Sequence, residues 1–151
     1  GHTPQFDAVV NQHIEVVRVM LKREDAIKAL QIYNNMGQTP LMYATMQATQ
    51  GAAFDVLQLL LDAGDRLPTR FPEPMLQYMT DPRQVSQLLQ ADFAGIWLRD
   101  IMGHTYDRLK KQKNVLKHFR AIDLVVEKHK ERIDSHSLKQ MQSIKEMARA
   151  C

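Results

Sequence analysis

The sequence GQTPLMYA at residues 37–44 decides the fold of the chain. Gly37 permits the unusual backbone angles of a tight turn. Thr39 is a good N-cap, because its hydroxyl accepts a hydrogen bond from an otherwise unpaired helical N–H. Pro40 suits the first helical position, where no backbone N–H is needed. The stretch therefore predicts a turn, a cap and the start of a helix.

Two other stretches share this pattern, residues 1–4 (GHTP) and residues 103–106 (GHTY). The first glycine precedes Gly37 by 36 residues, and the glycine of the last stretch follows it by 66 residues, which is twice 33. A recurrence near 33 residues indicates a repeat protein built from one supersecondary unit. Four repeats fit the chain, and the third carries a degraded signature near residues 70–92.

The segments that follow these motifs resemble ankyrin repeats, in which a short helix led by Thr-Pro, a turn and a second helix rich in Val and Leu follow one another. Residues 13–21 (HIEVVRVML) match without a gap, and residues 54–65 (FDVLQLLLDAGD) end much like the family's Leu-Leu-x-x-Gly close. The second repeat carries an insertion around residues 46–53. The resemblance implies an all-α, ankyrin-like helical repeat stack, strongly for residues 1–65 and weakly for residues 66–128. A non-ankyrin helical stack is the structural alternative.

The third repeat departs from the pattern, because residues 66–74 contain three prolines and lack Gly-x-Thr-Pro. A short helix is expected over residues 73–79. Asp81 and Pro82 then supply an N-cap and a first-turn proline for a second helix. The apolar face of that second helix is formed by Val85, Leu88 and Leu89.

The fourth repeat regains the glycine motif at residues 103–105 but has Tyr106 where proline is expected. We expect another turn there, followed by a helix. The apolar face of that helix is marked by Val115, Leu116, Phe119, Ile122 and Val126.

The C-terminal segment has the features of a closing helix. Ser137 and Gln140 are spaced as a capping box, and an apolar stripe of Leu138, Met141 and Ile144 follows. A terminal helix with one polar face is what a repeat stack needs at its end. We therefore expect divergent ankyrin repeats over residues 1–130 and a C-terminal helical cap over residues 131–151. Because Gly1 stands in mid-motif, we also expect the chain to be a fragment of a longer protein.

Composition excludes several classes of protein. A hydrophobic content of 44% is normal for a globular chain. The longest aliphatic run is residues 59–61, far short of the roughly 20 apolar residues of a membrane span. The only cysteine is Cys151, so no intrachain disulfide can form. An intracellular, cytoplasmic location is expected, or delivery into a host cell if the chain belongs to an effector.

Catalytic and metal-binding motifs are missing from the sequence. The Gly-rich phosphate loops, His-Glu-x-x-His and Gly-x-Ser-x-Gly do not occur. His13 and Glu15 have the His-x-Glu spacing of zinc deaminases, but the required Pro-Cys-x-x-Cys partner is absent. His118 and His129 lie about three helical turns apart, too far to chelate one ion. We expect no enzymatic activity, no metal and no cofactor in this chain.

Ankyrin repeats bind partner proteins through the turn tips and the ends of the first helices, and the resemblance carries this role to particular residues. The candidate partner-binding residues are Asn35, Met36, Gln38, Met46, Gln47, Ile101, Met102 and His104, with His2, Val10 and Asn11 as matches in the first repeat. Met36, Ile101 and Met102 are apolar where a solvated tip would be polar. They either pack against neighbouring turns or form an exposed apolar edge for a partner.

The positive charge lies in the last third of the chain. Residues 1–100 hold 8 Lys and Arg against 11 Asp and Glu, whereas residues 101–151 hold 12 against 6, which gives the net +3. A candidate basic patch consists of Arg108, Lys110, Lys111, Lys113 and Lys117, extended by Arg120, Lys128, Lys130 and Arg132. Such a patch is able to attract nucleic acid or anionic lipid, but few aromatics interleave it for base stacking. A solvated face and an acidic protein partner are the other interpretations.

Taken together, these features predict a protein–protein interaction module that recognises another protein through the concave face and turn tips of its repeats. Divergent repeats with insertions also resemble those of effector proteins that intracellular bacteria deliver into host cells, so the module is expected to serve an effector or a scaffold. The alternatives are an electrostatic binder of lipid or nucleic acid, and the non-catalytic regulatory part of a larger enzyme.

Overall fold

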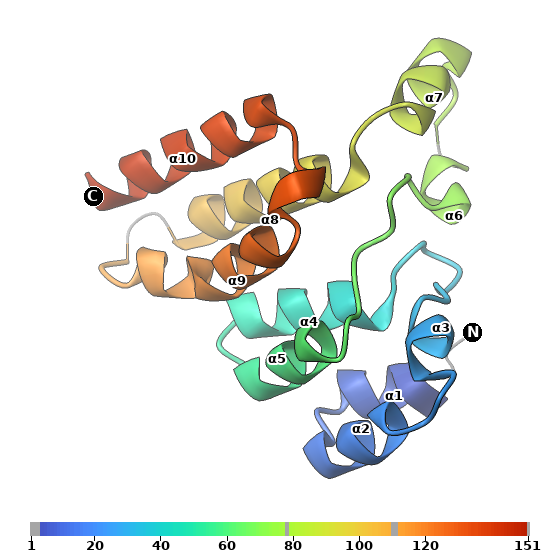
Figure 1. Cartoon of the computed structure of the whole chain (residues 1–151). Helices are drawn as coiled ribbons and strands as arrows, with labels where there is room; N and C mark the ends of the chain where they lie inside the picture. Colours follow the sequence, from blue (N-terminus) through green and yellow to red (C-terminus); the bar gives the residue numbers. More distant parts are fainter. Residues whose placement is uncertain (1–3, 78, 110–111, 151) are drawn as a thin grey trace.

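The computed structural model describes residues 4–77, 79–109 and 112–150, with side chains from residue 6 onward. Within these ranges the chain forms helices and no β-strand (Figure 1). In the same ranges, no helix is both long and apolar enough to cross a membrane. The α-helices are α1 (Pro4–Val10), α2 (Ile14–Leu21), α3 (Ala26–Leu30), α4 (Pro40–Thr49), α5 (Phe54–Asp62), α6 (Glu73–Leu76), α7 (Pro82–Leu89), α8 (Phe93–Leu109), α9 (Arg120–Lys128) and α10 (Ser135–Arg149). The 3-10 helices are η1 (Val115–Phe119) and η2 (Lys130–Arg132).

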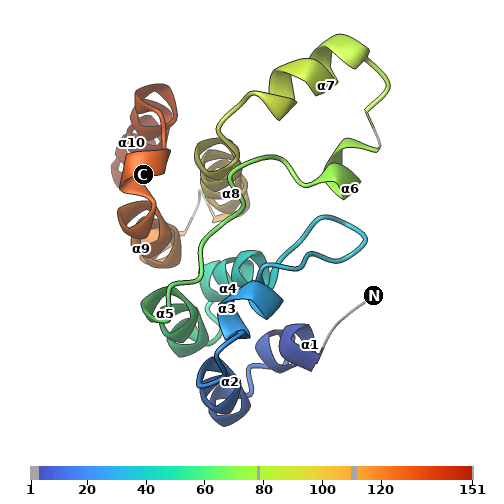
Figure 2. The same cartoon turned by 45° about the vertical axis from the view of Figure 1, so that its right-hand side comes forward.

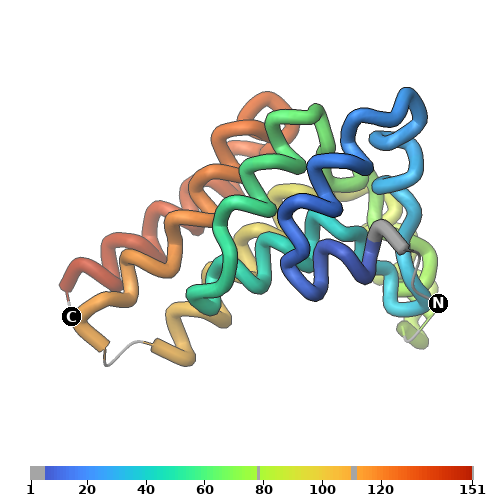
Figure 3. Tube along the Cα trace, turned by 90° about the horizontal axis from the view of Figure 1, so that it is seen from below, coloured from blue at the N-terminus to red at the C-terminus, as the bar shows by residue number. Residues whose placement is uncertain are grey.

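The helices stack as three antiparallel pairs and one closing helix. α1 packs against α2, α4 against α5, and α8 against α9, and the pairs follow one another along the chain (Figures 1 and 3). α9 contacts both α4 and α5, and α10 lies along α8. One hydrophobic core runs through the pairs. The predicted all-α repeat stack is therefore confirmed.

The second pair begins as its sequence predicts. The Thr39 hydroxyl accepts a hydrogen bond from the Met42 N–H at 3.3 Å, and Pro40 occupies the first turn of α4. α5 buries a face of Val and Leu side chains. Gly64 then ends the pair with a φ of +100°, a conformation that glycine adopts without steric cost.

The first pair also forms as expected, although residues 1–3 lie outside the described part of the chain. Phe6 on α1 packs edge-to-face on Tyr43 of α4, with ring centroids 5.0 Å apart. The Gln47 amide donates to the Val10 carbonyl at 2.6 Å and so links α4 to the end of α1. The short helix α3, which the sequence motifs did not predict, packs against α1 and α2.

The expected third repeat does not take its place in the stack. Asp81 caps α7 as predicted, accepting from the Arg83 N–H at 2.9 Å, and the helix expected over residues 73–79 forms only as α6. However, neither helix contains a fully buried residue, and both project from the helix pairs (Figures 1 and 2). α7 has too few apolar residues to form a layer, so the next pair begins only at Phe93, 53 residues after Pro40.

The turn predicted at residues 103–105 is wrong, because these residues lie inside the continuous helix α8. The physical reason is the packing of α8, whose buried positions recur at helical spacing. These positions are Ala94, Leu98, Met102, Thr105 and Leu109. Burial of this face outweighs the roughly 1 kcal/mol that a mid-helix glycine costs. Thr105 is followed by Tyr106 and not by proline, so nothing at this position forces a new helix to start.

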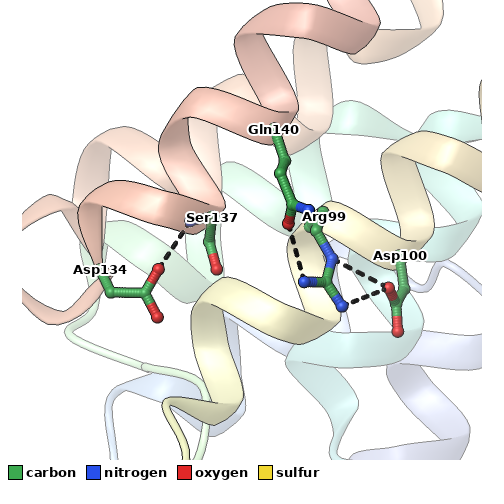
Figure 4. Close-up of polar contacts among 5 residues, drawn as sticks. All are labelled: Arg99, Asp100, Asp134, Ser137 and Gln140. Carbon is green, nitrogen blue, oxygen red and sulfur yellow. Dashed lines mark hydrogen bonds and ion pairs between the residues drawn. The ribbon is translucent and has the colours of Figure 1, made fainter.

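The closing helix α10 lies where the sequence places it, but its cap differs. Asp134 is the N-cap and accepts from the Ser137 N–H at 2.6 Å, so the predicted capping box of Ser137 and Gln140 is wrong (Figure 4). Instead, Gln140 accepts a hydrogen bond from Arg99 of α8 at 2.8 Å. Gly95 allows this close approach, because a Cβ there would lie 3.0 Å from the Ser137 hydroxyl. The predicted domain division at residue 130 stays a prediction.

Candidate partner-binding surface

The loop between α3 and α4, residues 31–39, is called the finger loop here, and it projects from the helix pairs (Figure 2). Its conformation is fixed by the buried side chain of Asn34. The Asn34 Oδ1 accepts from the N–H groups of Met36 at 2.9 Å and Gln38 at 3.1 Å. The backbone N–H of Asn34 donates to the Gln38 carbonyl at 2.9 Å. The side chain thus adds to the backbone pairing of the turn, as Asn commonly does by bonding nearby backbone groups.

The finger loop exposes three large apolar side chains, Ile32, Tyr33 and Met36, which we name the apolar tip. Met36 is 62% exposed and Ile32 57% exposed. Met36 is therefore exposed, and its part in partner binding stays a prediction. Asn35 beside it is also exposed, and Gln38 is half-buried with its side chain bonded to Asn34.

The back of the finger loop rests against the segment that leads into α6. Gly37 has a φ of +82°, and a Cβ there would lie 2.6 Å from the Met75 Cγ and 3.2 Å from the Pro72 Cβ. Only glycine fits this contact without displacement of its neighbours. The apolar tip is therefore presented by a loop that is fixed on two sides, by Asn34 within and by residues 72–75 behind.

Two predicted partner residues, Met46 and Gln47, lie on α4 and are half-buried. The Gln47 amide is engaged with the Val10 carbonyl, so this residue joins two helix pairs. Its role at a partner interface is untested.

Three further predicted residues were expected at a turn tip but lie on α8. Met102 is fully buried, so of its two interpretations the packed one holds, although it packs from within helix α8 and not from a turn. Ile101 is half-buried. His104 is exposed and lines a shallow hollow between α8 and α10, at whose edge Arg99 pairs with Asp100 at 3.1 Å (Figure 4). The sequence signal that locates these three residues on a helix is the helical spacing of the buried positions of α8, and not the glycine motif.

The candidate basic patch is only partly described, because Lys110 and Lys111 lie outside the described residues. Arg108, Lys113 and Lys117 are exposed. Of the residues that extend the patch, Lys128 lies 3.9 Å from Asp62, and Lys130 lies 4.0 Å from Glu127. Arg120 covers the Phe54 ring at 4.4 Å. Two of the extending lysines thus lie near a carboxylate, whereas Arg108, Lys113 and Lys117 face solvent.

A groove of about 560 Å³ runs between the finger loop and the extended segment of residues 66–72, which we call the strap. It is lined by Gln31, Tyr33 and Thr39 of the finger loop, by the strap and by Arg132. Sequence reasoning missed this groove. Its walls come from segments far apart in the chain, and no local pattern connects them.

The strap is tied to the third helix pair by two hydrogen bonds. The Leu67 N–H donates to the His129 Nε2, and Arg132 donates to the Leu67 carbonyl, both at 2.8 Å. The His129 Nδ1 lies 2.8 Å from the Val125 carbonyl, so this nitrogen carries the proton. Burial lowers the pKa of His129 to about 4, which keeps the imidazole neutral and able to accept.

Asp65, immediately before the strap, is buried and its two carboxylate oxygens have no hydrogen-bond partner within the described residues. Burial raises the pKa of Asp65 to about 7, against the opposing effect of the adjacent Arg66. This carboxyl is therefore only partly ionised at neutral pH, and it offsets only part of the positive charge beside it.

Comparison with known families agrees with this architecture. Residues 1–70, which span the first two helix pairs and most of the strap, match the family model described as ankyrin repeats (3 copies). Comparison with curated proteins and with solved structures finds no match. Residues 1–70 of the chain are therefore similar to ankyrin repeats.

Proposed function

We propose that this chain is a protein–protein interaction module whose apolar tip anchors a partner protein. Ankyrin repeats are generally protein–protein interaction modules and are typically non-catalytic, which supports binding rather than catalysis. The observation that carries the proposal is the apolar tip itself, where Ile32, Tyr33 and Met36 are exposed together on one loop.

The energetics of the finger loop favour binding. Complete burial of one such side chain contributes about 1.5–3 kcal/mol, and the loop is already ordered by Asn34, so little entropy is lost on association. Tyr is enriched at interface hot spots, and Met adapts to irregular partner surfaces. The tip is therefore suited to act as the centre of an interface.

Polar residues next to the tip supply the rim of the proposed interface. Asn35 is exposed beside Met36, and Gln38 is half-buried behind it. Met46 on α4 extends the surface toward the stack. Met102, being buried, is left out of the proposal. For Arg108, Lys113 and Lys117, no contact among the described residues favours lipid or nucleic acid over solvent, so no second function is proposed.

The test is capture of a partner from extracts of the source cells by immobilised protein, followed by mass spectrometry. We expect Tyr33→Glu and Met36→Glu to reduce recovery of the captured partner at least tenfold. Leu116→Glu is the matched control, because Leu116 and Tyr33 are each 40% exposed and Leu116 lies on η1. Equal recovery with both tip variants, or equal loss with the control, would refute the proposal.

A further inference from the structure

The groove between the finger loop and the strap is lined by three arginines, Arg66, Arg70 and Arg132, and we call it the arginine groove. None of its described lining residues is acidic. Tyr33, Phe71 and the two prolines of the strap supply the apolar part of its surface. Arginine is well suited to bind carboxylate and phosphate groups, because its planar guanidinium donates two parallel hydrogen bonds.

Two of the arginines are held in place by backbone carbonyl groups. Arg66 donates through Nη1 to the carbonyls of Leu61 at 3.1 Å and Asp65 at 2.7 Å. Arg132 donates through Nη2 to the Leu67 carbonyl at 2.8 Å. A guanidinium has five N–H donors, so each of these side chains is fixed in position and keeps further donors for a ligand. Arg70 is exposed and makes no hydrogen bond or ion pair within the described residues.

The charge around the groove is positive. Burial lowers the pKa of Arg132, the nearby positive charge of Arg66 lowers it further, and Asp92 opposes this effect. Asp65 next to Arg66 is only partly ionised near pH 7. Glu127 and Glu131 do not line the groove. They line a second hollow that also includes Arg66 and Arg132, and there Glu127 lies 4.0 Å from Lys130.

We propose that the arginine groove binds an acidic peptide segment of the partner protein, with a carboxylate held between Arg66 and Arg132 and a second one at Arg70. This inference rests on the proposed protein-binding function. Two observations favour a peptide. Tyr33 belongs both to the apolar tip and to the groove wall, so the two surfaces are continuous. The positive charge of the lining matches the negative charge of the proposed segment.

The test is fluorescence anisotropy with a labelled ten-residue peptide of alternating glutamate and alanine. We expect saturable binding that weakens with added salt, and no binding of the same peptide with glutamine in place of glutamate. Arg70→Glu is expected to raise the Kd at least about tenfold, which corresponds to loss of one charge-assisted hydrogen bond. Arg149→Glu, which makes the same charge change on an exposed position at the end of α10, is expected to alter the Kd less than about twofold.

Two results would overturn the inference. One is an equal loss of affinity with Arg70→Glu and Arg149→Glu, which would show attraction to net charge only. The other is a labelled oligothymidine that binds more tightly than the peptide and loses its affinity with Arg70→Glu, which would make the groove a nucleic-acid site. Met36 does not line the groove, so the peptide titration with Arg70→Glu and the partner capture with Met36→Glu fail independently of each other.

Discussion

Substitution by alanine is expected to change the free energy of unfolding in opposite directions at two glycines that share a sequence motif. Gly37 and Gly103 both begin Gly-x-Thr, but Gly37 lies in the finger loop with a φ of +82°, whereas Gly103 lies within helix α8. A Cβ at Gly37 would meet Met75 and Pro72, whereas a Cβ at Gly103 meets no atom within 4 Å. The pair therefore tests whether local motif or tertiary packing decides the conformation.

The expected magnitudes follow from these surroundings. For Gly37→Ala, the left-handed conformation costs about 1–2 kcal/mol and overpacking against residues 72–75 costs about 1–3 kcal/mol. The free energy of unfolding should therefore fall by about 2–5 kcal/mol. For Gly103→Ala, better helix propensity should raise it by up to about 1 kcal/mol. A change of 1 kcal/mol corresponds to about 2–4 °C in Tm for a chain of this length.

The assay is urea unfolding followed by circular dichroism at 222 nm and by fluorescence of Trp97, the single tryptophan, which lies on α8. Repeat stacks are able to unfold layer by layer. A single free energy of unfolding is therefore derived only when the two probes give coincident transitions. A Gly103→Ala variant destabilised by 1 kcal/mol or more, together with an unaffected Gly37→Ala variant, would refute the reasoning. That outcome would place the turn at Gly103.

Three further substitutions test the electrostatics and the finger loop. The folded protein retains the Asp65 proton that the unfolded chain releases near pH 4, so the wild type loses stability as the pH rises from about 4 to 7. Asp65→Asn lacks this loss. Relative to wild type, it should gain up to about 4 kcal/mol of stability over that range, as measured by urea titrations. For His129 the sign is opposite, because on lowering the pH the unfolded chain binds the proton first. Relative to wild type, His129→Gln should lose up to about 3 kcal/mol of stability as the pH rises from about 4 to 6.5. A pH-independent difference would exclude the neutral, accepting imidazole. In the finger loop, Asn34→Ala should raise the hydrogen-exchange rates of the Met36 and Gln38 amides at least about tenfold, whereas exposed Asn35→Ala should leave them unchanged.

The sequence predicted those elements whose signals are local. Thr39 and Pro40 start a helix by hydrogen bonding and ring geometry within a few residues, so α4 begins where expected. The same holds for the N-cap at Asp81, although α7 then remains outside the stack. A cap fixes where a helix begins, but burial of its apolar face decides whether that helix joins the core.

The prediction at residues 103–105 was wrong for a complementary reason. A glycine is compatible with a turn but does not impose one, and Met102 and Thr105 are buried on the face that α8 presents to its neighbours. The packing of α8 was readable from the spacing of its apolar residues. The short glycine motif carried less information than that spacing, because no proline supported it.

The candidate surface was only half predictable. Met36 was recognised because an apolar residue stood where a turn tip is expected, and it is exposed. The arginine groove was not recognised, because Arg66 and Arg132 are brought together by the bonds of the strap to His129 and Arg132. Such long-range contacts leave no periodic trace in one sequence.

Photo-crosslinking from the finger loop tests the central proposal most directly. A benzophenone side chain placed at Met36, in protein added to extracts of the source cells, should yield one dominant covalent adduct with a partner protein. The same group at Leu116, an exposed apolar position on η1, should yield no such adduct. Adducts of equal yield and identity from both positions, or no adduct from Met36, would contradict the assignment of the apolar tip as the partner-binding surface.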